Sequence, residues 1–489
     1  MRMAISESPM TTSMPTYKQA TRRICIMSAD IQYAGHWKVP GTDEVFEGTL
    51  HYNEETRALV LQLIQPFDTK TFDSHILASF RLPVICGKLF SGSHVALLGC
   101  LRTNTHTHIG SHTTETIYAD YALWGLEEGD CESPLFRGCA IDYGAVLEWA
   151  GLCYYNLDTN KGQLGEIIRW SYEDDIELDM AGGLHLRFSP RQGSFSLMDY
   201  RNDVIFHQRI ETRFFYDAPR RWQEIMFDVD WLRRLIELGK GREVGIREVR
   251  YLHPSHLLLK EYGAEGQDRY EPADVLLGTE QRDVADEHSR RWTFLFNLSE
   301  AYARGALRAW FEKRDELEPV VNLYTLAYTD KIPSAMALFL NLMQALETYH
   351  ARFVCDSAKA YKKRVDSLVE NISSAGPDVR DFLCDSGQQG STSLYLKSRI
   401  SDLLYAGGRR PVSPKHMYFF DFPQKLVDTR NYYTHYSQGK RDKAFGKEEL
   451  PIVNAELMAL LEYYLMLTLG FDDETTLKNV QRRLRDRIG

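Results

Sequence analysis

Several features of common protein classes are missing from this sequence. None of its eight cysteines forms a C-x-x-C pair, which argues against a disulfide framework and a zinc ribbon. No run of eighteen apolar residues occurs, so no membrane span is expected. Residues 1–23 lack the apolar stretch of a secretory signal, so we predict a flexible leader and a cytoplasmic protein. Walker loops, dinucleotide fingerprints and nucleophile elbows are also absent, and no cofactor is expected.

Length and charge set further bounds. A chain of 489 residues is too long for one hydrophobic core and should divide into two or three domains. The net charge of −10 should repel nucleic acid at long range, so any nucleic-acid site must be a local basic patch.

The segment 24–270 has the pattern of a β-rich domain. Short alternating or apolar runs, such as residues 57–64, 94–101 and 184–189, are separated by turn residues. Their length and aromatic content favour strands of an antiparallel, sandwich-like domain, with one helix over residues 219–238.

The pattern changes after a polar segment at 261–286, which is the best domain boundary. From 271 to 489 apolar residues recur every three or four positions, which predicts an all-α region with a core at about 333–470. The predicted helices cover residues 290–316, 333–364, 379–384, 391–404, 423–436 and 451–469. The fold class is therefore α+β, with a β-rich part followed by a helical bundle.

One predicted helix carries a pair of residues suited to RNA chemistry. It reads Arg430-Asn431-Tyr432-Tyr433-Thr434-His435. Histidine titrates near neutral pH and can move a proton from a ribose 2′-hydroxyl or to a departing 5′-oxygen. Arginine can hold phosphate oxygens as negative charge develops. Such a reaction needs no metal and leaves a 2′,3′-cyclic phosphate and a 5′-hydroxyl.

Arg430 and His435 do not lie on one face of the helix, so a partner surface must close the site. At about 100° per residue, Arg430 and His435 lie about 140° apart on a helix and flank a groove. Asn431 lies one turn before His435 and could orient the imidazole or contact phosphate. The bare spacing is expected about once by chance in such a chain, and a salt-bridged structural pair is the alternative interpretation.

Three segments resemble a known family. Residues 426–436 resemble the signature helix of HEPN domains, and residues 339–350 resemble the first long helix of the ApeA-like HEPN branch. The motif Gly35-His36-Trp37-Lys38-Val39-Pro40, followed by Phe46-Glu47-Gly48-Thr49-Leu50, is similar to the opening of the β-rich domain in ApeA-type proteins. The chain thus resembles the ApeA-like HEPN ribonucleases over most of its length.

This resemblance implies an anti-phage abortive-infection effector, in which a β-rich regulatory or sensing domain is attached to a HEPN ribonuclease. In that family two HEPN domains pair, so that both Arg/His motifs meet at a composite site, and the expected assembly is a homodimer or a larger homo-oligomer. The implied substrate is cellular RNA, with tRNA the leading candidate by analogy, and a phage-derived trigger is a possible partner. The alternative is a non-catalytic HEPN dimer whose β-rich domain binds a ligand or phage component.

Other residues near the motif are candidates for auxiliary roles. Tyr432, Tyr433 and Tyr436 could stack on unpaired bases, although core or dimer packing is the simpler interpretation. Lys440, Arg441 and the arginines at 482–487 could neutralise phosphates, although a solvated tail is the default for the last group. Glu347 could orient Arg430 or His435, or be an ordinary surface glutamate.

Four other histidines are candidate catalytic or metal-binding residues. His350 is expected to be a solvated helix residue. Cys100, His106, His108 and His112 form the one cluster that suggests a metal, but their spacing fits no zinc pattern. A turn rich in Thr and His is the default there, so no metal site is predicted.

Overall fold

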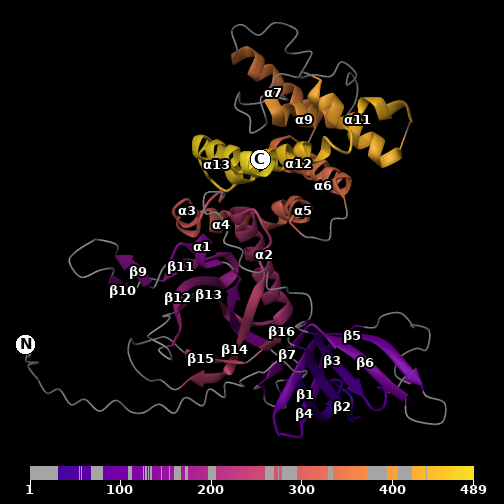
Figure 1. Ribbon diagram of the computed structural model, residues 1–489, viewed down its shortest axis with the longest axis vertical. Coiled ribbons are helices and arrows are strands. Elements are labelled where there is room, and N and C mark those ends of the chain that lie inside the picture. Colours follow the sequence, from indigo (N-terminus) through magenta and orange to yellow (C-terminus); the bar gives the residue numbers. More distant parts are fainter. Residues whose placement is uncertain are drawn as a thin grey trace, which may run out of the picture.

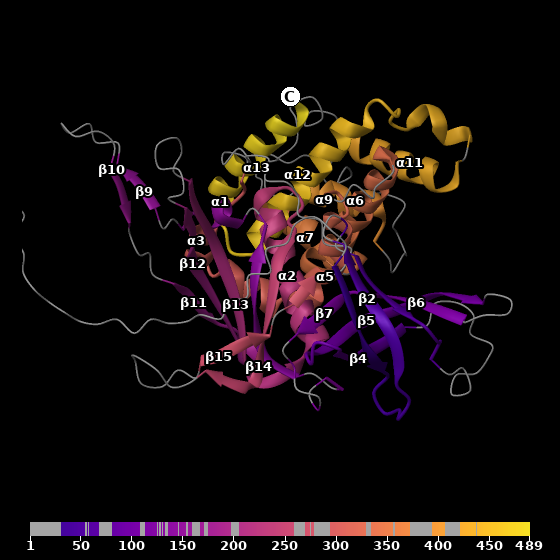
Figure 2. The same ribbon diagram turned by 60° about the horizontal axis from the view of Figure 1, so that its bottom comes forward.

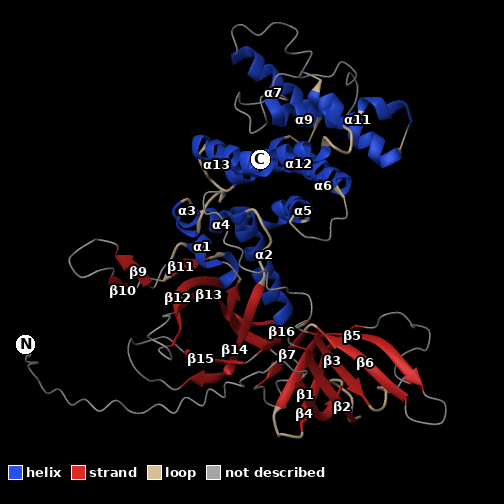
Figure 3. Ribbon diagram, viewed as in Figure 1, coloured by secondary structure: helices blue, strands red, loops and turns tan. Residues whose placement is uncertain are grey.

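The fold divides into a β-rich end and a helical end (Figures 1 and 3). In this computed structural model the β-rich end consists of a barrel and a second sheet that lie side by side. The C-terminal helices gather at the opposite end (Figures 1 and 2). The structure describes residues 31–489 apart from 54–55, 57, 68–80, 108–112, 125, 127–128, 130, 133–134, 145, 153–154, 159–166, 171–174, 197–204, 259–268, 274, 278–293, 329–333, 356, 372–393, 406–420 and 437.

The first six strands close into an antiparallel barrel. They are β1 (Ile31–Lys38), β2 (Phe46–Asn53), β3 (Ala58–Leu63), β4 (Arg81–Leu89), β5 (His94–Thr107) and β6 (Thr113–Ala119). The pairing order is β5-β4-β1-β2-β3-β6, and β6 pairs back onto the second half of β5. The first half of β5 instead pairs with β7 (Tyr121–Trp124), which pairs with β16 (Val275–Leu277). Closure removes the two free edges that an open sheet would leave.

The ring of Trp37 packs so closely in the barrel that glycine is needed on a neighbouring strand. Its ring is fully buried in the barrel, and Nε1 donates to the carbonyl oxygen of Gly48 at 3.1 Å. A Cβ atom at Gly87 would collide with the Trp37 ring, so the neighbouring strand β4 must carry glycine there. Close packing of this kind leaves no room for an added methyl group.

A second antiparallel sheet stands beside the barrel. Its order is β11-β12-β13-β8-β14-β15, with β8 (Leu135–Tyr143), β11 (Ile176–Asp179), β12 (Leu184–Ser196), β13 (Ile205–Arg221), β14 (Ile246–Leu258) and β15 (Arg269–Ala273). A hairpin of β9 (Tyr155–Asp158) and β10 (Ile167–Trp170) and the short helix α1 (Val146–Ala150) interrupt its connections.

Helix α2 (Trp222–Lys240) joins this sheet to the helical end. Tyr143 of β8 donates to the carbonyl oxygen of Val229 at 2.7 Å, which holds α2 on the sheet. On the opposite side Trp231 stacks on Trp310, with ring centroids 4.6 Å apart, and each indole N–H donates to the other's carbonyl oxygen. One hydrophobic core therefore runs from the second sheet through α2 into the helices.

The helical end is built around α12 (Leu450–Thr468). Around it lie α3 (Leu298–Ala303), α4 (Ala306–Glu312), α5 (Arg314–Thr325), α6 (Ala335–Tyr349), α7 (Ala358–Asn371), α9 (Leu396–Tyr405), α11 (Phe422–His435) and α13 (Asp473–Ile488). Helix α12 has the length and hydropathy of a membrane span, but 78% of that stretch is buried. This burial is the normal environment of a central core helix.

The predicted fold class, a β-rich part followed by a helical bundle, is confirmed. The predicted helix at 219–238 is α2, and those at 423–436 and 451–469 are α11 and α12. The single helix predicted over 290–316 is wrong, because α3, α4 and α5 divide the described part of it, with Gly305 in a left-handed conformation at one break. Strands β15 and β16 lie within the predicted boundary at 261–286, and the leader 1–23 lies outside the described residues.

Candidate functional site

Helix α11 carries the Arg/His motif. Pro423 lies in its first turn, where its missing N–H costs no hydrogen bond, and Tyr436 ends it in a left-handed conformation with φ of 50°. The following segment folds back onto the helix: the backbone N–H of Phe445 donates to Thr429 Oγ1 at 2.9 Å, and Tyr433 donates to the Phe445 carbonyl at 3.1 Å. The end of α11 is therefore held firmly.

Arg430, Asn431 and Glu347 line one cavity of about 340 Å³, between α6, α9 and α11. Arg430 Nη1 donates to Asn431 Oδ1 at 3.3 Å, and Lys397 of α9 adds a second positive charge to the cavity wall. Among the described residues Arg430 forms no ion pair, so its guanidinium is available to an anion. The three residues that the sequence singled out here do lie together.

His435 lies elsewhere on the same helix. It is the last residue of α11, its side chain is exposed, and it does not line the cavity that Arg430 lines. This agrees with the expected angle of about 140° between the two side chains. Within one chain, the described residues thus bring Arg430 and Asn431 to one cavity that His435 does not line.

A second cavity, of about 690 Å³, opens on another face of α11. Its walls include Tyr432, Tyr433, Tyr436 and Arg441, all of which the sequence offered as candidates for contact with RNA. Lys440 behaves differently, because its ammonium pairs with the buried carboxylate of Asp428. Of the two basic residues proposed beside the motif, only Arg441 therefore lines a cavity.

The expectation for His350 is wrong. Its side chain is fully buried at the end of α6, where Nε2 lies 2.9 Å from Asp402 and Nδ1 lies 3.2 Å from Arg399 Nη1. Because a guanidinium only donates, Nδ1 accepts and the proton sits on Nε2. The helical stripe placed His350 beside buried Tyr349, but partners on α9 were invisible in the sequence.

The expectation of a solvated tail for the terminal arginines is also wrong for Arg483 and Arg487. Both donate to the buried carboxylate of Glu462 on α12, Arg483 at 3.0 Å. Burial by itself would raise the pKa of Glu462, but Arg487 and Arg483 outweigh it and lower the pKa to about 2. These two guanidinium groups are therefore not available to phosphate.

The cysteine and histidine cluster gives no metal centre among the described residues. The thiol of Cys100 is buried in the barrel and donates to the Leu97 carbonyl, and burial raises its pKa. The backbone of His106 lies on β5, whereas His108 and His112 lie outside the described residues. Across the described parts of the chain, no group of three possible metal ligands occurs.

Sequence reasoning missed Lys397 and Met336, which line the two cavities beside α11. Lys397 lies in a helix that was predicted only from its apolar residues, and it belongs to no sequence motif. No local pattern could therefore have identified it as a site residue. Met336 begins the apolar stripe of α6, which predicted core packing and not a cavity wall.

A β-rich region joined to an α bundle, with Arg430, Asn431 and His435 on a bundle helix, is the architecture of a multidomain HEPN protein. Comparison with family models makes this specific: residues 32–300 match ApeA N-terminal domain 1, and residues 340–475 match the Apea-like HEPN domain. The chain belongs to the ApeA family. Neither curated proteins nor solved structures give a match.

Proposed function

We propose that this protein is a metal-independent endoribonuclease of an anti-phage abortive-infection system, acting in the cytoplasm. A HEPN domain makes ribonuclease activity possible, and it covers residues 340–475. The observation that carries the proposal is the single cavity that Arg430, Asn431 and Lys397 line together. Guanidinium, amide and ammonium groups are the donors that hold a phosphodiester.

The chemistry follows from the two residue types. The 2′-oxygen attacks phosphorus, the bond from phosphorus to the 5′-oxygen breaks, and a 2′,3′-cyclic phosphate and a 5′-hydroxyl result. His435 takes the proton from the 2′-hydroxyl or gives one to the 5′-oxygen. Arg430 stabilises the added negative charge on the phosphoryl oxygens, and Asn431 positions the phosphate.

A second copy of the chain completes this site in the proposal. Since Arg430 and His435 face different directions on α11, one chain leaves the phosphate cavity without an imidazole. Antiparallel approach of two α11 helices would bring His435 of one copy toward Arg430 of the other. The homodimer is then part of the active site, because neither copy alone surrounds the scissile phosphate.

Glu347 acts in this proposal as a positioning residue. It comes from α6, the helix that packs against α11, and it faces the cavity with Arg430 and Asn431. A carboxylate in that place fixes the guanidinium or the amide by hydrogen bonding and does not itself contact phosphate, which it would repel.

The RNA class and the trigger extend the proposal. Cellular RNA is the substrate, with tRNA first by analogy with other HEPN ribonucleases. The β-rich region would keep the nuclease quiet until a phage-derived trigger arrives, and α2 supplies a rigid connection because it packs on both the second sheet and α5. A conformational change in the second sheet would therefore be transmitted through α2 to the helical bundle.

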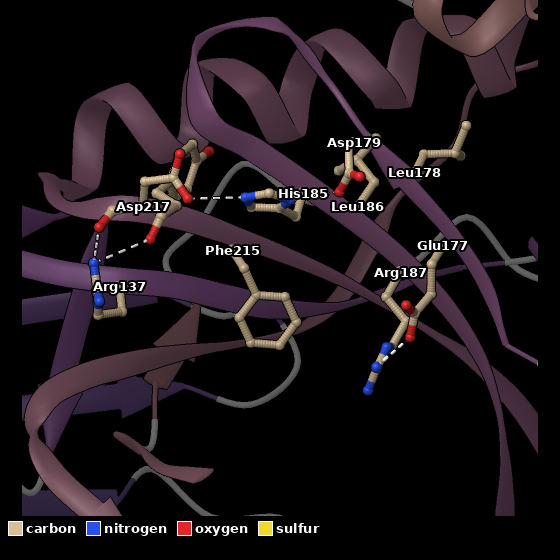
Figure 4. Close-up of a pocket in the computed structure, with 10 residues that line it drawn as sticks. Arg137, Glu177, Leu178, Asp179, His185, Leu186, Arg187, Phe215 and Asp217 are labelled. Atoms are coloured by element: carbon tan, nitrogen blue, oxygen red, sulfur yellow. Dashed lines mark hydrogen bonds and ion pairs between the residues drawn. The ribbon is translucent and has the colours of Figure 1, made fainter. Parts of the chain in front are cut away.

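A second candidate function is supported by a cavity in the β-rich region. About 400 Å³ is open on the second sheet, where His185 bridges Asp179 at 2.6 Å and Asp217 at 3.0 Å (Figure 4). The hydrogen bonds to Asp179 and Asp217 raise the pKa of His185. If the bundle only dimerises, this charged cavity is where the β-rich region would bind a ligand or a phage component.

The test is cleavage of total cellular RNA and of purified tRNA by the full-length protein. Wild type should give fragments with 5′-hydroxyl and cyclic phosphate ends, with or without EDTA. Arg430→Ala and His435→Ala should each abolish cleavage while the mass of the oligomer in solution stays unchanged.

His51→Ala is the matched control, because it removes a histidine from β2 of the barrel, far from α11. It should cleave like wild type. Equal RNA patterns for wild type and His435→Ala, with and without phage infection of the host, would remove the nuclease assignment and leave the ligand-binding alternative.

A further inference from the structure

The large cavity beside the end of α11 has the properties of a built ligand site. It measures about 690 Å³, within the range of about 300–1,000 Å³ that small-molecule sites occupy. Its walls come from three separate parts of the chain: the start of α6, the end of α11 and the segment before α12. Tertiary packing creates this space, because no single segment could enclose it.

Aromatic rings dominate the α11 side of the cavity. Tyr433 is buried against the core, the Tyr432 ring is tilted against it with centroids 5.0 Å apart, and the Tyr436 ring lies edge-on to Tyr432 with centroids 5.8 Å apart. Tyr436 is 60% exposed although its hydroxyl donates to Met336 Sδ at 3.2 Å. A large aromatic ring is thus kept in place at the cavity while most of its surface stays open to solvent.

The backbone at Tyr436 is unusual. Among the described residues it is the one non-glycine with positive φ, at 50°, in a position at the end of a helix where glycine is the common choice. A bulky residue in this conformation is strained, and such strained residues are typical of functional sites. Glycine would relieve that strain but would remove the ring from the cavity.

Positive charge accompanies the rings. Arg441 and Lys447 line the cavity, both are exposed, and within the described residues neither forms an ion pair. Asp442 is the one acidic side chain among the described lining residues. The cavity therefore combines stacking surfaces with free cations, which suits a planar ring attached to an anion.

The position of His435 relates this cavity to the proposed chemistry. At about 100° per residue, His435 lies about 40° from Asn431 on one side and about 60° from Tyr432 on the other. Asn431 lines the phosphate cavity and Tyr432 lines the aromatic cavity. By helix geometry the imidazole therefore projects from α11 between these two lining residues.

We propose that the aromatic cavity binds one unstacked nucleobase of single-stranded RNA, beside the phosphate that Arg430 and His435 cleave. The base stacks on Tyr436 and Tyr432, and Arg441 and Lys447 hold the adjacent phosphates. This inference rests on the proposed function and deepens it, since it selects unpaired loops and not duplex RNA, because a base in a duplex must first be unpaired and unstacked.

The experiment uses the full-length chain with His435→Ala, so that RNA is bound but not cut. The probe is a fluorescent RNA hairpin whose uridine loop carries one 5-iodouridine, and anisotropy gives its affinity. Tyr436→Leu should weaken binding roughly 5- to 150-fold, the usual effect of losing one base–aromatic stack. Tyr436→Phe should keep the affinity, because the ring remains.

Tyr302→Leu is the matched control: Tyr302 is 47% exposed on α3, and its loss should leave binding unchanged. Irradiation should cross-link the iodouridine to Tyr432 or Tyr436. A perfect duplex of the same sequence should bind more weakly and should not cross-link there.

The outcomes separate the two proposals. Cleavage by the wild type together with unchanged affinity in Tyr436→Leu, or cross-links confined to other residues, overturns the base site and leaves the nuclease standing. Tyrosine cross-links without any cleavage by the wild type support the base site and remove the nuclease. Sedimentation is measured in parallel, and conversion of Tyr436→Leu to a monomer overturns the base site in favour of a second copy in the cavity.

Discussion

Arg483 and Glu462 form a buried ion pair, at 3.0 Å, in the middle of the helical end. The same guanidinium donates to the carbonyl oxygens of Leu238 and Gly239, at the last turn of α2. Arg483 of α13 therefore donates hydrogen bonds to the last turn of α2 and also balances the negative charge of Glu462 on α12. The β-rich region and the HEPN bundle are joined through it.

Removal of the Glu462 charge should destabilise the protein strongly. Glu462→Gln leaves Arg483 and Arg487 buried beside a neutral amide, and breaking a buried pair on one side costs about 3–5 kcal/mol. Urea unfolding followed by circular dichroism measures the loss. The control is Arg485→Ala, which removes an exposed arginine from α13, the helix that carries Arg483 and Arg487. It should change stability by less than about 0.5 kcal/mol.

The same carboxylate should make stability depend on pH. Its folded pKa of about 2 is below the ordinary value of 4.5, so the unfolded chain binds a proton first as pH falls. Stability from Glu462 is complete above pH 4.5 and is lost as pH falls toward 2. Unfolding free energies measured across this window should fall for wild type, and a slope of equal steepness in Glu462→Gln would contradict the assignment.

Two histidines should separate stability from activity. His350→Ala removes one hydrogen-bond partner from each of the buried residues Asp402 and Arg399, and each loss should cost about 1–3 kcal/mol. His435→Ala removes an exposed ring and should change stability by less than about 0.5 kcal/mol while it abolishes RNA cleavage. Thermal melting and cleavage assays on both variants give the comparison, and a folded but inactive His350→Ala would count against it.

Two neighbouring cations should respond differently to salt. Arg441→Gln should lower the slope of log affinity for single-stranded RNA against log salt by about 0.7, the effect of one lost phosphate contact. Lys440→Gln should leave that slope unchanged, because its ammonium already pairs with Asp428. Binding by the His435→Ala protein at several salt concentrations measures both, and equal slopes for the two variants would contradict this distinction.

Local patterns in the sequence determined the element types and the chemistry of α11. The alternating runs of the N-terminal half and the helical recurrence of the C-terminal half fixed the fold class, because side-chain periodicity follows directly from strand and helix geometry. The same periodicity placed Arg430 and His435 on different sides of α11, and the structure agrees, because His435 does not line the cavity that Arg430 lines.

Only the tertiary structure decided how distant segments meet. Barrel closure depends on β6 pairing with both β3 and β5, and the partners of His350 and Arg483 lie on other helices. Whether a charged side chain is solvated or buried depends on such partners, since burial is tolerated where opposite charge and hydrogen bonds replace water. For that reason sequence periodicity identified the helix that carries the site, whereas packing formed the two cavities beside α11.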